Sequence, residues 1–351
     1  MFNEIKYKNS TLVNADSLAY MKTLPDNCID LILTDPPYFK VKKDKWDNQW
    51  DNEAAFLGWL DDCFAEFYRL LKPSGSLYVF CGSKLASDTE ILMRQRFKVL
   101  SHIVWAKPNG PWLRQHKEDL RAFFPSTERI LFAEHYDADG FAKGLVGYGS
   151  KCQELKGQVF SPLIEYFKTA RESLGISAAE INQATGTQMC SHWFSYSQWV
   201  LPNEIQYKAL QKLFNQKEQG NLLDRQYSDI SLQYGTLRKE YSELSLEFDE
   251  LKKEYNNLRR PFYVTSDVPY TDVWTYPPVT YYKGKHPCEK PAEMIKNIIN
   301  SSSRPGQVVA DFFMGSGVTI KQSLLLDRIS IGVELEEARF MQTERELKEK
   351  Y

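Results

Sequence analysis

The stretch that decides the fold is Ile29-Asp30-Leu31-Ile32-Leu33-Thr34-Asp35-Pro36-Pro37-Tyr38. Its first five residues are mostly apolar, which is typical of a buried strand. The two prolines have no N–H to donate and fix their own φ, so they end the strand in a stiff corner. That corner presents the Asp35 carboxylate, the Pro36 carbonyl and the Tyr38 ring, which together suit a planar group bearing an exocyclic amino group. An ordinary turn at the end of a strand is the alternative.

The composition is that of a globular protein long enough for two domains, with 351 residues, 42% hydrophobic and 26% charged. The net charge of −2 means that a polyanionic partner must be held by local basic patches. Six cysteines without a C-x-x-C pair or a His/Cys cluster are typical of reduced thiols in a cytoplasmic protein and predict no metal site. The first residues lack a signal-peptide core, and no run of 18 apolar residues predicts a membrane span.

Strand-like and helix-like segments alternate over the first 135 residues and again near the end of the chain. Such alternation predicts a parallel sheet with helices on both faces, begun in the first segment and completed in the last. The expected strands are 29–33, 76–80, 99–105, 129–132, 308–313 and 329–334, and the expected helices are 53–71, 292–301, 318–326 and 335–350.

The segment between these two parts has a different pattern, of short helices followed by a long one. Ser177 and Glu180 have the spacing of a capping box, and Gly186 separates their helix from a second one near Met189–Phe194. This arrangement resembles a helix-turn-helix unit, and an unrelated small helical bundle is the alternative.

Residues 223–258 carry an unbroken 4-3 apolar repeat over five heptads, which predicts a coiled-coil helix. A partner helix must cover this seam. We expect the same helix of a second subunit, which makes a homodimer, and an internal helix such as 203–218 is the alternative. The seam consists of aliphatic Leu223, Ile230, Leu237, Leu244, Leu251 and Leu258 and aromatic Tyr227, Tyr234, Tyr241, Phe248 and Tyr255.

A Gly-x-Gly turn between two expected strands points to a nucleotide ligand. Gly315 and Gly317 follow the strand that ends at Phe313, and the next strand ends on Glu334, 17 residues after Gly317. Glycines let a ligand approach the backbone, a helix start offers free N–H groups, and an acid at such an interval can accept from ribose hydroxyls. The third glycine of the dinucleotide fingerprint is absent, so an adenosyl ligand without phosphates is favoured. A plain tight turn is the alternative.

Four motifs together resemble those of the amino-methyltransferases of DNA, in the order typical of their beta group. They are Thr34–Tyr38, His286–Pro291, Asp311–Gly317 and Gly332–Glu334, within segments 1–135 and 263–351. The resemblance implies a circularly permuted, Rossmann-like S-adenosylmethionine-dependent methyltransferase sheet, and it is closest to prophage-encoded adenine methyltransferases of relaxed sequence specificity. Asp before the prolines leans toward adenine N6, whereas cytosine-N4 members more often carry Ser, and RNA or protein-glutamine methyltransferases tend to carry Asn. One departure is Cys288-Glu289, where Thr-Gln is commoner.

The resemblance implies a mechanism at this corner. The target base is flipped out of the duplex, Tyr38 stacks on it, and Asp35 and the Pro36 carbonyl accept its two amino hydrogens, while Pro37 completes the corner. These bonds push the amino nitrogen toward sp3 and localise its lone pair for attack on the methyl group of S-adenosylmethionine, so catalysis is mainly positioning and electrostatics. No thiol nucleophile is expected.

The resemblance also implies a cofactor site and DNA contacts. Glu334 would bind the ribose; Asp16 would lie near the adenine amino group, with a helix N-cap as the alternative; Lys290 would hold the methionine carboxylate, with a capped helix end as the alternative. The cofactor residues would be Asp16, Asp35, Lys290, Asp311, Phe312, Phe313, Gly315, Ser316, Gly317, Glu334 and Leu335, and the phosphate contacts Lys40, Lys42, Lys43, Lys107, Arg114 and Lys117.

We therefore expect an α/β methyltransferase domain in two halves, 1–140 and 263–351, split by a helical insertion, 141–262, for target recognition and oligomerisation. The predicted activity is methyl transfer from S-adenosylmethionine to N6 of adenine in double-stranded DNA, by a cytoplasmic enzyme of bacterial or prophage origin. The alternatives are a cytosine-N4 or RNA methyltransferase and a non-catalytic DNA-binding regulator. The corner at 35–38 argues against the regulator, because a sensor needs no base-reading acid.

Overall fold

The computed structural model describes residues 2–41, 44–108, 118, 121–138, 140, 147–196, 198–217, 222–264 and 270–351. They form two compact units, Met1–Phe141 with Arg259–Tyr351, and Ala142–Leu258. The second unit falls within the predicted insertion. In the described parts of both units, every helix is too short or too polar to cross a membrane.

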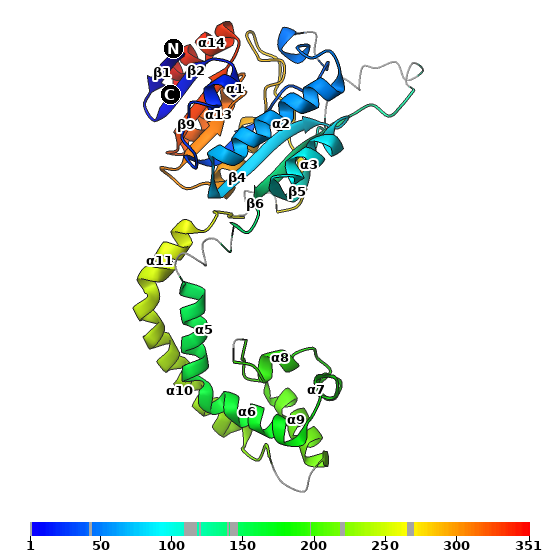
Figure 1. Ribbon diagram of the computed structural model, residues 1–351, viewed down its shortest axis with the longest axis vertical. Helices are drawn as coiled ribbons and strands as arrows, with labels where there is room; N and C mark the ends of the chain where they lie inside the picture. The colour runs from blue at the N-terminus through cyan, green and yellow to red at the C-terminus, as the bar shows by residue number, and fades with distance from the viewer. Residues whose placement is uncertain are drawn as a thin grey trace. The chain divides into compact units, whose positions relative to one another are not determined.

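The described residues of the first unit form one nine-stranded mixed sheet (Figure 1). The pairs β2–β9, β9–β8, β8–β3, β3–β4 and β5–β7 are parallel, whereas β1–β2, β4–β6 and β5–β6 are antiparallel. Two strands from the end of the chain thus lie between two from its beginning. The order across the sheet is β1 (Asn3–Tyr7), β2 (Ser10–Asn14), β9 (Ile329–Glu334), β8 (Val308–Asp311), β3 (Ile29–Thr34), β4 (Leu71–Gly82), β6 (Thr127–His135), β5 (Phe97–Ala106) and β7 (Val273–Thr275).

The prediction of a parallel sheet is wrong at β6, which runs antiparallel to both of its neighbours, β4 and β5. It pairs with β5 from His135 opposite Phe97 to Thr127 opposite Ala106. Antiparallel neighbours need no crossover helix, and local residue pattern does not distinguish the two pairings. The strand predicted at 76–80 begins earlier, at Leu71 directly after α2: Ile29 pairs with Leu71 and Leu31 with Ser76, so residues 72–75 form a bulge.

Helices cover both faces of the sheet, because successive residues of β3 point to opposite sides. Ile32 packs in the core formed with the first three helices, while Leu31 and Leu33 pack in the core formed with α12. On the first face lie α1 (Ser17–Met21), α2 (Glu53–Leu70) and α3 (Ala86–Arg94); on the second lie α12 (Ala292–Ser302), α13 (Val318–Leu325) and α14 (Glu337–Lys350).

The second unit is helical. The predicted capping box is confirmed, since Ser177 accepts from the Glu180 N–H and the Glu180 side chain accepts from the Ser177 N–H, and Gly186 ends that helix with φ 63°. The likeness to a helix-turn-helix stays a prediction. The helices are α5 (Tyr148–Val159), α6 (Ser161–Leu174), α7 (Ala178–Thr185), α8 (Cys190–Trp193), α9 (Glu204–Lys217), α10 (Tyr227–Ser245), the 3-10 turn η4 (Leu246–Phe248) and α11 (Asp249–Leu258).

The heptad seam packs within its own unit over much of its length. Leu223 and Ile230 are fully buried, and α5 contacts both α10 and α11. The segment proposed as an internal partner, α9, contributes Tyr207, whose ring lies against Tyr227. The other seam residues on this core are Tyr234, Leu237, Tyr241 and Leu244. The structure therefore supplies an internal cover for 223–244, and the homodimer stays a prediction.

An ion pair joins the two segments of the first unit near the points where the chain enters and leaves the insertion. Glu134 lies near the end of β6, and Arg260 follows α11 directly; Arg260 Nε donates to Glu134 Oε2 at 2.5 Å. The guanidinium also lies over the rings of Phe132 and Phe262, 5.2 and 5.6 Å from their centroids. We call this contact the Glu134–Arg260 clasp.

The internal packing of the seam predicts different effects for two neighbouring aliphatic residues of α10. Ile230→Ala should lower the free energy of unfolding by about 2–5 kcal/mol, because its side chain is fully buried. Leu232→Ala, at a side chain 76% exposed on the same helix, should cost less than about 0.5 kcal/mol. Urea unfolding followed by circular dichroism measures both, and equal losses would contradict internal packing.

Candidate active site

The corner at 35–38 and the Gly-x-Gly turn emerge at the same edge of the sheet, because β3 and β8 are parallel neighbours. Side chains tie the two strand ends together. Thr34 Oγ1 donates to Asp311 Oδ1 at 3.0 Å and accepts from the Phe312 N–H at 3.2 Å. Two motifs separated by 277 residues in sequence are thereby fixed side by side.

A buried aspartate holds the turn that follows the corner. Phe39 and Lys40 have φ of 63° and 56°, a left-handed conformation that is uncommon for residues other than glycine. Asp47, 1% exposed, compensates by accepting from the N–H of Tyr38 at 3.0 Å and of Val41 at 2.6 Å. The corner is thus fixed by Asp47 as well as by its prolines.

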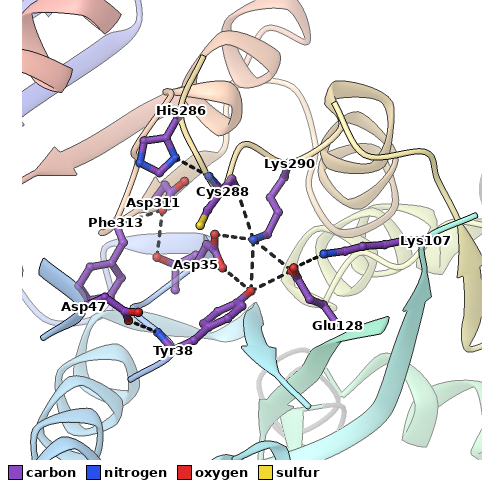
Figure 2. Close-up of polar contacts among 11 residues, drawn as sticks. Asp35, Tyr38, Asp47, Lys107, Glu128, His286, Cys288, Lys290, Asp311 and Phe313 are labelled. Carbon is purple, nitrogen blue, oxygen red and sulfur yellow. Dashed lines mark hydrogen bonds and ion pairs between the residues drawn. The ribbon is translucent and has the colours of Figure 1, made fainter. Parts of the chain in front are cut away.

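Lys290 lies at the centre of a buried network of charges (Figure 2). Its ammonium is 2.6 Å from Asp35 Oδ2, 3.2 Å from Tyr38 Oη and 3.3 Å from Glu128 Oε2. The Tyr38 hydroxyl lies 2.7 Å from Asp35 Oδ1 and 3.1 Å from Glu128 Oε2. Lys107 forms a second ion pair with Glu128. Two carboxylates, two ammonium groups and one phenol therefore meet at the corner.

The network fixes the protonation of its members. Desolvation raises the pKa of Asp35, and Lys290 opposes this while Glu128 adds to it. Although burial works in the opposite direction, Lys290 and Lys107 lower the pKa of Glu128 to about 2. Burial alone would lower the pKa of Lys290, but Asp35 and Glu128 raise it above its usual range. Desolvation and the two carboxylates raise the pKa of Tyr38, so its hydroxyl stays protonated.

A cavity opens beside this network, and residues from both halves of the sheet line it, among them Tyr38 and Glu334. Glu334 lines it and accepts from the N–H of Gly315 at 2.9 Å and of Glu336 at 2.8 Å. Desolvation raises the pKa of Glu334 to about 7. The carboxylate retains lone pairs for hydroxyl donors, and Trp59 and Phe313 give the wall aromatic surface. These features fit an adenosyl ligand with a ribose.

The structure brings almost all of the predicted catalytic and cofactor residues into this cavity. Asp16 lines it and caps α1, accepting from the Ala19 N–H at 2.9 Å, so the N-cap alternative is confirmed and the contact with the adenine amino group stays a prediction. Lys290 bonds to Asp35, and the methionine-carboxylate role stays a prediction. Gly317 lies at the N-cap of α13 with φ 68°. The lining includes Asp35, Pro36, Pro37, Tyr38, Asp311, Phe312, Phe313, Gly315, Ser316 and Leu335.

Two of the predicted phosphate contacts, Lys40 and Lys107, are among the described residues, and neither lines this cavity. Lys40 is exposed, and its ammonium donates to the Asp51 carbonyl at 2.8 Å. Lys107 is only 21% exposed and pairs with Glu128, which sets it in the charge network rather than on the surface. The remaining four, Lys42, Lys43, Arg114 and Lys117, lie outside the described residues.

Sequence reasoning missed Glu128 and Asp47. Glu128 is the second residue of β6, and because β6 runs antiparallel to β4, its first residues reach the edge where β3 and β8 end. With the parallel pairing that we predicted, Glu128 would have been at the opposite edge. The available signal was an acid at the start of an apolar strand, but this signal could be interpreted only with knowledge of the direction in which the strand runs. Asp47 carried no signal in the sequence pattern.

The family described as DNA methylase (N6_N4_Mtase) matches residues 29–345. The chain belongs to this family. It is therefore a DNA methyltransferase of the N6/N4 type, and S-adenosylmethionine is its cofactor. The matched region includes both halves of the sheet and the insertion between them.

Two curated relatives extend over most of the chain. DNA adenine methyltransferase YhdJ of Escherichia coli (strain K12) is 24% identical over 332 residues, 93% of this chain and 78% of the relative. Type II methyltransferase M2.MboI of Moraxella bovis is 22% identical over 347 residues, 94% and 84% of the two chains. Among solved structures, the cytosine-N4-specific PvuII DNA methyltransferase aligns with a TM-score of 0.51 at 13% identity, over 97% of this chain and 86% of that one, which shows the shared fold.

The cavity predicts that a methyl group at position 315 weakens cofactor binding. A Cβ on Gly315 would lie 3.2 Å from the His286 ring, and φ of +50° strains any other residue. Gly315→Ala should reduce affinity for S-adenosylmethionine tenfold or more by isothermal titration calorimetry, about 1.4 kcal/mol. Gly235→Ala, in α10 with no atom near its Cβ, is the matched control and should leave affinity unchanged. Unchanged affinity in Gly315→Ala would contradict this assignment of the turn.

Proposed function

We propose that this DNA methyltransferase transfers a methyl group to N6 of adenine. The observation that carries the proposal is the Asp35 carboxylate beside the cofactor cavity, next to the Pro36 carbonyl. A carboxylate offers about four lone-pair sites. Lys290 and Tyr38 occupy one on each oxygen, which leaves acceptor capacity for an amino hydrogen.

The residues of the corner activate the amino group by holding its hydrogens. An aromatic amino group is a poor nucleophile because its lone pair is delocalised into the ring. Acceptance of one hydrogen by Asp35 and the other by the Pro36 carbonyl draws the nitrogen toward sp3 geometry. Bound S-adenosylmethionine supplies the methyl group on a sulfonium sulfur, which leaves as a neutral thioether. After the transfer the methylated nitrogen carries a positive charge and both of its original hydrogens, and it then releases one of them as a proton, so Asp35 acts through position and charge rather than as a strong base.

Two observations favour adenine over cytosine. Asp precedes the prolines, as the family resemblance associates with adenine N6. A relative that aligns with 93% of the chain is named a DNA adenine methyltransferase. Cytosine N4 is the second candidate, and the nucleoside formed distinguishes the two. The target base must leave the duplex to reach the cavity, because its amino group is otherwise paired.

We also propose that the sheet is the circularly permuted form of this methyltransferase fold and that the insertion selects the target. The positions of β8 and β9 between β2 and β3 support the permutation. The capping box of α7 and the short helix α8 that follows it are the features that favour a helix-turn-helix contact with DNA. Relaxed sequence specificity rests on resemblance, and mapping methylated adenines on mixed-sequence DNA tests it.

Asp35→Asn should reduce methyl transfer about a thousandfold, because the amide replaces one acceptor by a donor. The assay uses tritiated S-adenosylmethionine, unmodified duplex DNA and nucleoside digestion. Asp88→Asn, at an exposed carboxylate of α3, is the matched control and should retain full activity.

N4-methylcytosine as the product would replace the adenine assignment by the second candidate. Full activity in Asp35→Asn would refute the role of the corner whichever base is modified. Failure of the wild-type enzyme to methylate any DNA tested would refute both candidate functions.

The predicted homodimer is tested by light scattering at micromolar concentration. The predicted contact is the seam of 223–258, and its residues outside the insertion core, apart from Tyr255, whose ring stacks on Tyr148, are Phe248, Leu251 and Leu258. A mass of twice the 40.8 kDa chain is the expected result. A mass of 40.8 kDa would refute self-association under those conditions.

A further inference from the structure

The charge network holds more groups than the proposed chemistry uses. Asp35 and the Pro36 carbonyl suffice to hold an amino group, yet Glu128 places a second carboxylate against the same hydroxyl and the same ammonium (Figure 2). Lys290 is 5% exposed and Glu128 lies beside it, so these charges are kept in place at a cost in desolvation. A function in the reaction accounts for that arrangement.

The distances define two states for the donors. The Tyr38 hydroxyl has one proton and lies 2.7 Å from Asp35 and 3.1 Å from Glu128, so it donates to one carboxylate at a time. The Lys290 ammonium has three N–H donors and contacts both carboxylates, at 2.6 Å from Asp35 and 3.3 Å from Glu128. Both donors favour Asp35 in the structure. Glu128 is a second acceptor within reach of both donors.

We propose that Glu128 and Lys107 are positioning residues of this site. When a substrate amino group arrives, Glu128 is the alternative acceptor to which the Tyr38 hydroxyl and the Lys290 ammonium shift from Asp35. Lys107 neutralises part of the charge of Glu128 and so sets the strength of its electrostatic effect on Asp35. This inference rests on the proposed function of Asp35 as the amino-group acceptor.

The electrostatics around Asp35 agree with this assignment. Its charged and titratable neighbours are Lys290 from the loop before α12, Glu128 from β6, Tyr38 from its own corner, Asp311 from β8 and Cys81 from β4. Glu128 raises the pKa of Asp35, whereas Lys290 lowers it. Lys107 pairs with Glu128 on the side away from Lys290 and neutralises part of its charge.

Removing the charge of Glu128 and removing the charge of Lys107 should therefore shift the acidic limb of the pH–activity profile in opposite directions. Asp35 must be ionised to accept an amino hydrogen, so activity falls as pH falls through the pKa of Asp35. Glu128→Gln removes a negative charge and lowers that pKa, so the acidic limb moves to lower pH. Lys107→Met removes a positive charge, and the two carboxylates take up a proton more readily, so the limb moves to higher pH. We expect shifts of about half a pH unit or more.

The rate in the plateau gives a second measurement. Without a charged alternative acceptor, Lys290 stays on Asp35 and competes with the substrate. Glu128→Gln should lower kcat about tenfold or more, while KM for S-adenosylmethionine changes less than about twofold. Lys107→Arg keeps the positive charge and is the matched control, in which the acidic limb should stay in place.

The experiment measures single-turnover methylation of duplex DNA from pH 5 to 9 for the wild type and the three variants. Wild-type formation of N6-methyladenine tests the proposed function separately. With an active wild type, acidic limbs that stay in place, or that move in the same direction in both charge-removing variants, would overturn the inference.

A readout without substrate completes the test. The chain labelled with ¹³C at aspartate carboxyl carbons, with the Asp35 signal assigned by its loss in Asp35→Asn, reports the ionisation of Asp35 by NMR. The midpoint should fall in Glu128→Gln and rise in Lys107→Met. Should Glu128→Gln fail to fold, Lys107→Met remains decisive, since Lys107 is partly exposed: an unmoved midpoint there would refute the role of the pair.

Discussion

The parallel pairing of β3 with β8 is the constraint on which the site depends. Each strand ends in a segment that cannot continue a sheet, Pro36-Pro37 on one side and Gly315-Ser316-Gly317 on the other. Parallel strands put these ends at one edge, and the Thr34–Asp311 hydrogen bond fixes their separation. Any change in the register of this pair would displace the corner at 35–38 from the cavity, because a slip of one residue turns every side chain to the other face.

The chemistry at that edge is built from charges in near balance. Lys290 has Asp35 on one side and Glu128 on the other, and Lys107 compensates Glu128 from outside. A buried ion pair contributes little net stability, since desolvation offsets most of the attraction, but it fixes geometry closely. Under the proposed function, the geometry of hydrogen-bond donors around Asp35 is what the reaction requires.

The positions of the corner at 35–38 and of the Gly-x-Gly turn could be predicted from sequence because their residues end strands. Proline and glycine act locally, so Asp35, Gly315 and Glu334 reveal their positions at strand ends without any knowledge of pairing. Glu128 could not be predicted, because its place in the site depends on β6 running antiparallel, and strand direction is decided by contacts distant in sequence. The β1–β2 hairpin was missed for a related reason: its turn has no glycine, and Lys8 adopts φ of 49° instead.

The heptad repeat shows a second limit of prediction from sequence. Their spacing predicts one coiled-coil helix over 223–258, whereas the structure has α10 from Tyr227 and α11 to Leu258, separated by the 3-10 turn η4. Periodicity also does not identify what covers the apolar seam. The structure covers Leu223 and Ile230 with neighbouring helices of the same unit, which a repeat in a single segment cannot reveal.

The Glu134–Arg260 clasp has a consequence for how such an enzyme can diversify. It joins the chain immediately before and after the insertion, so the sheet is complete on its own side of this contact. The cost of closing a loop grows only slowly with its length, and a longer, shorter or unrelated module could be spliced between these two residues without moving β3 or β8. The clasp thus allows the insertion to change in length or sequence while the sheet that carries the cavity stays the same.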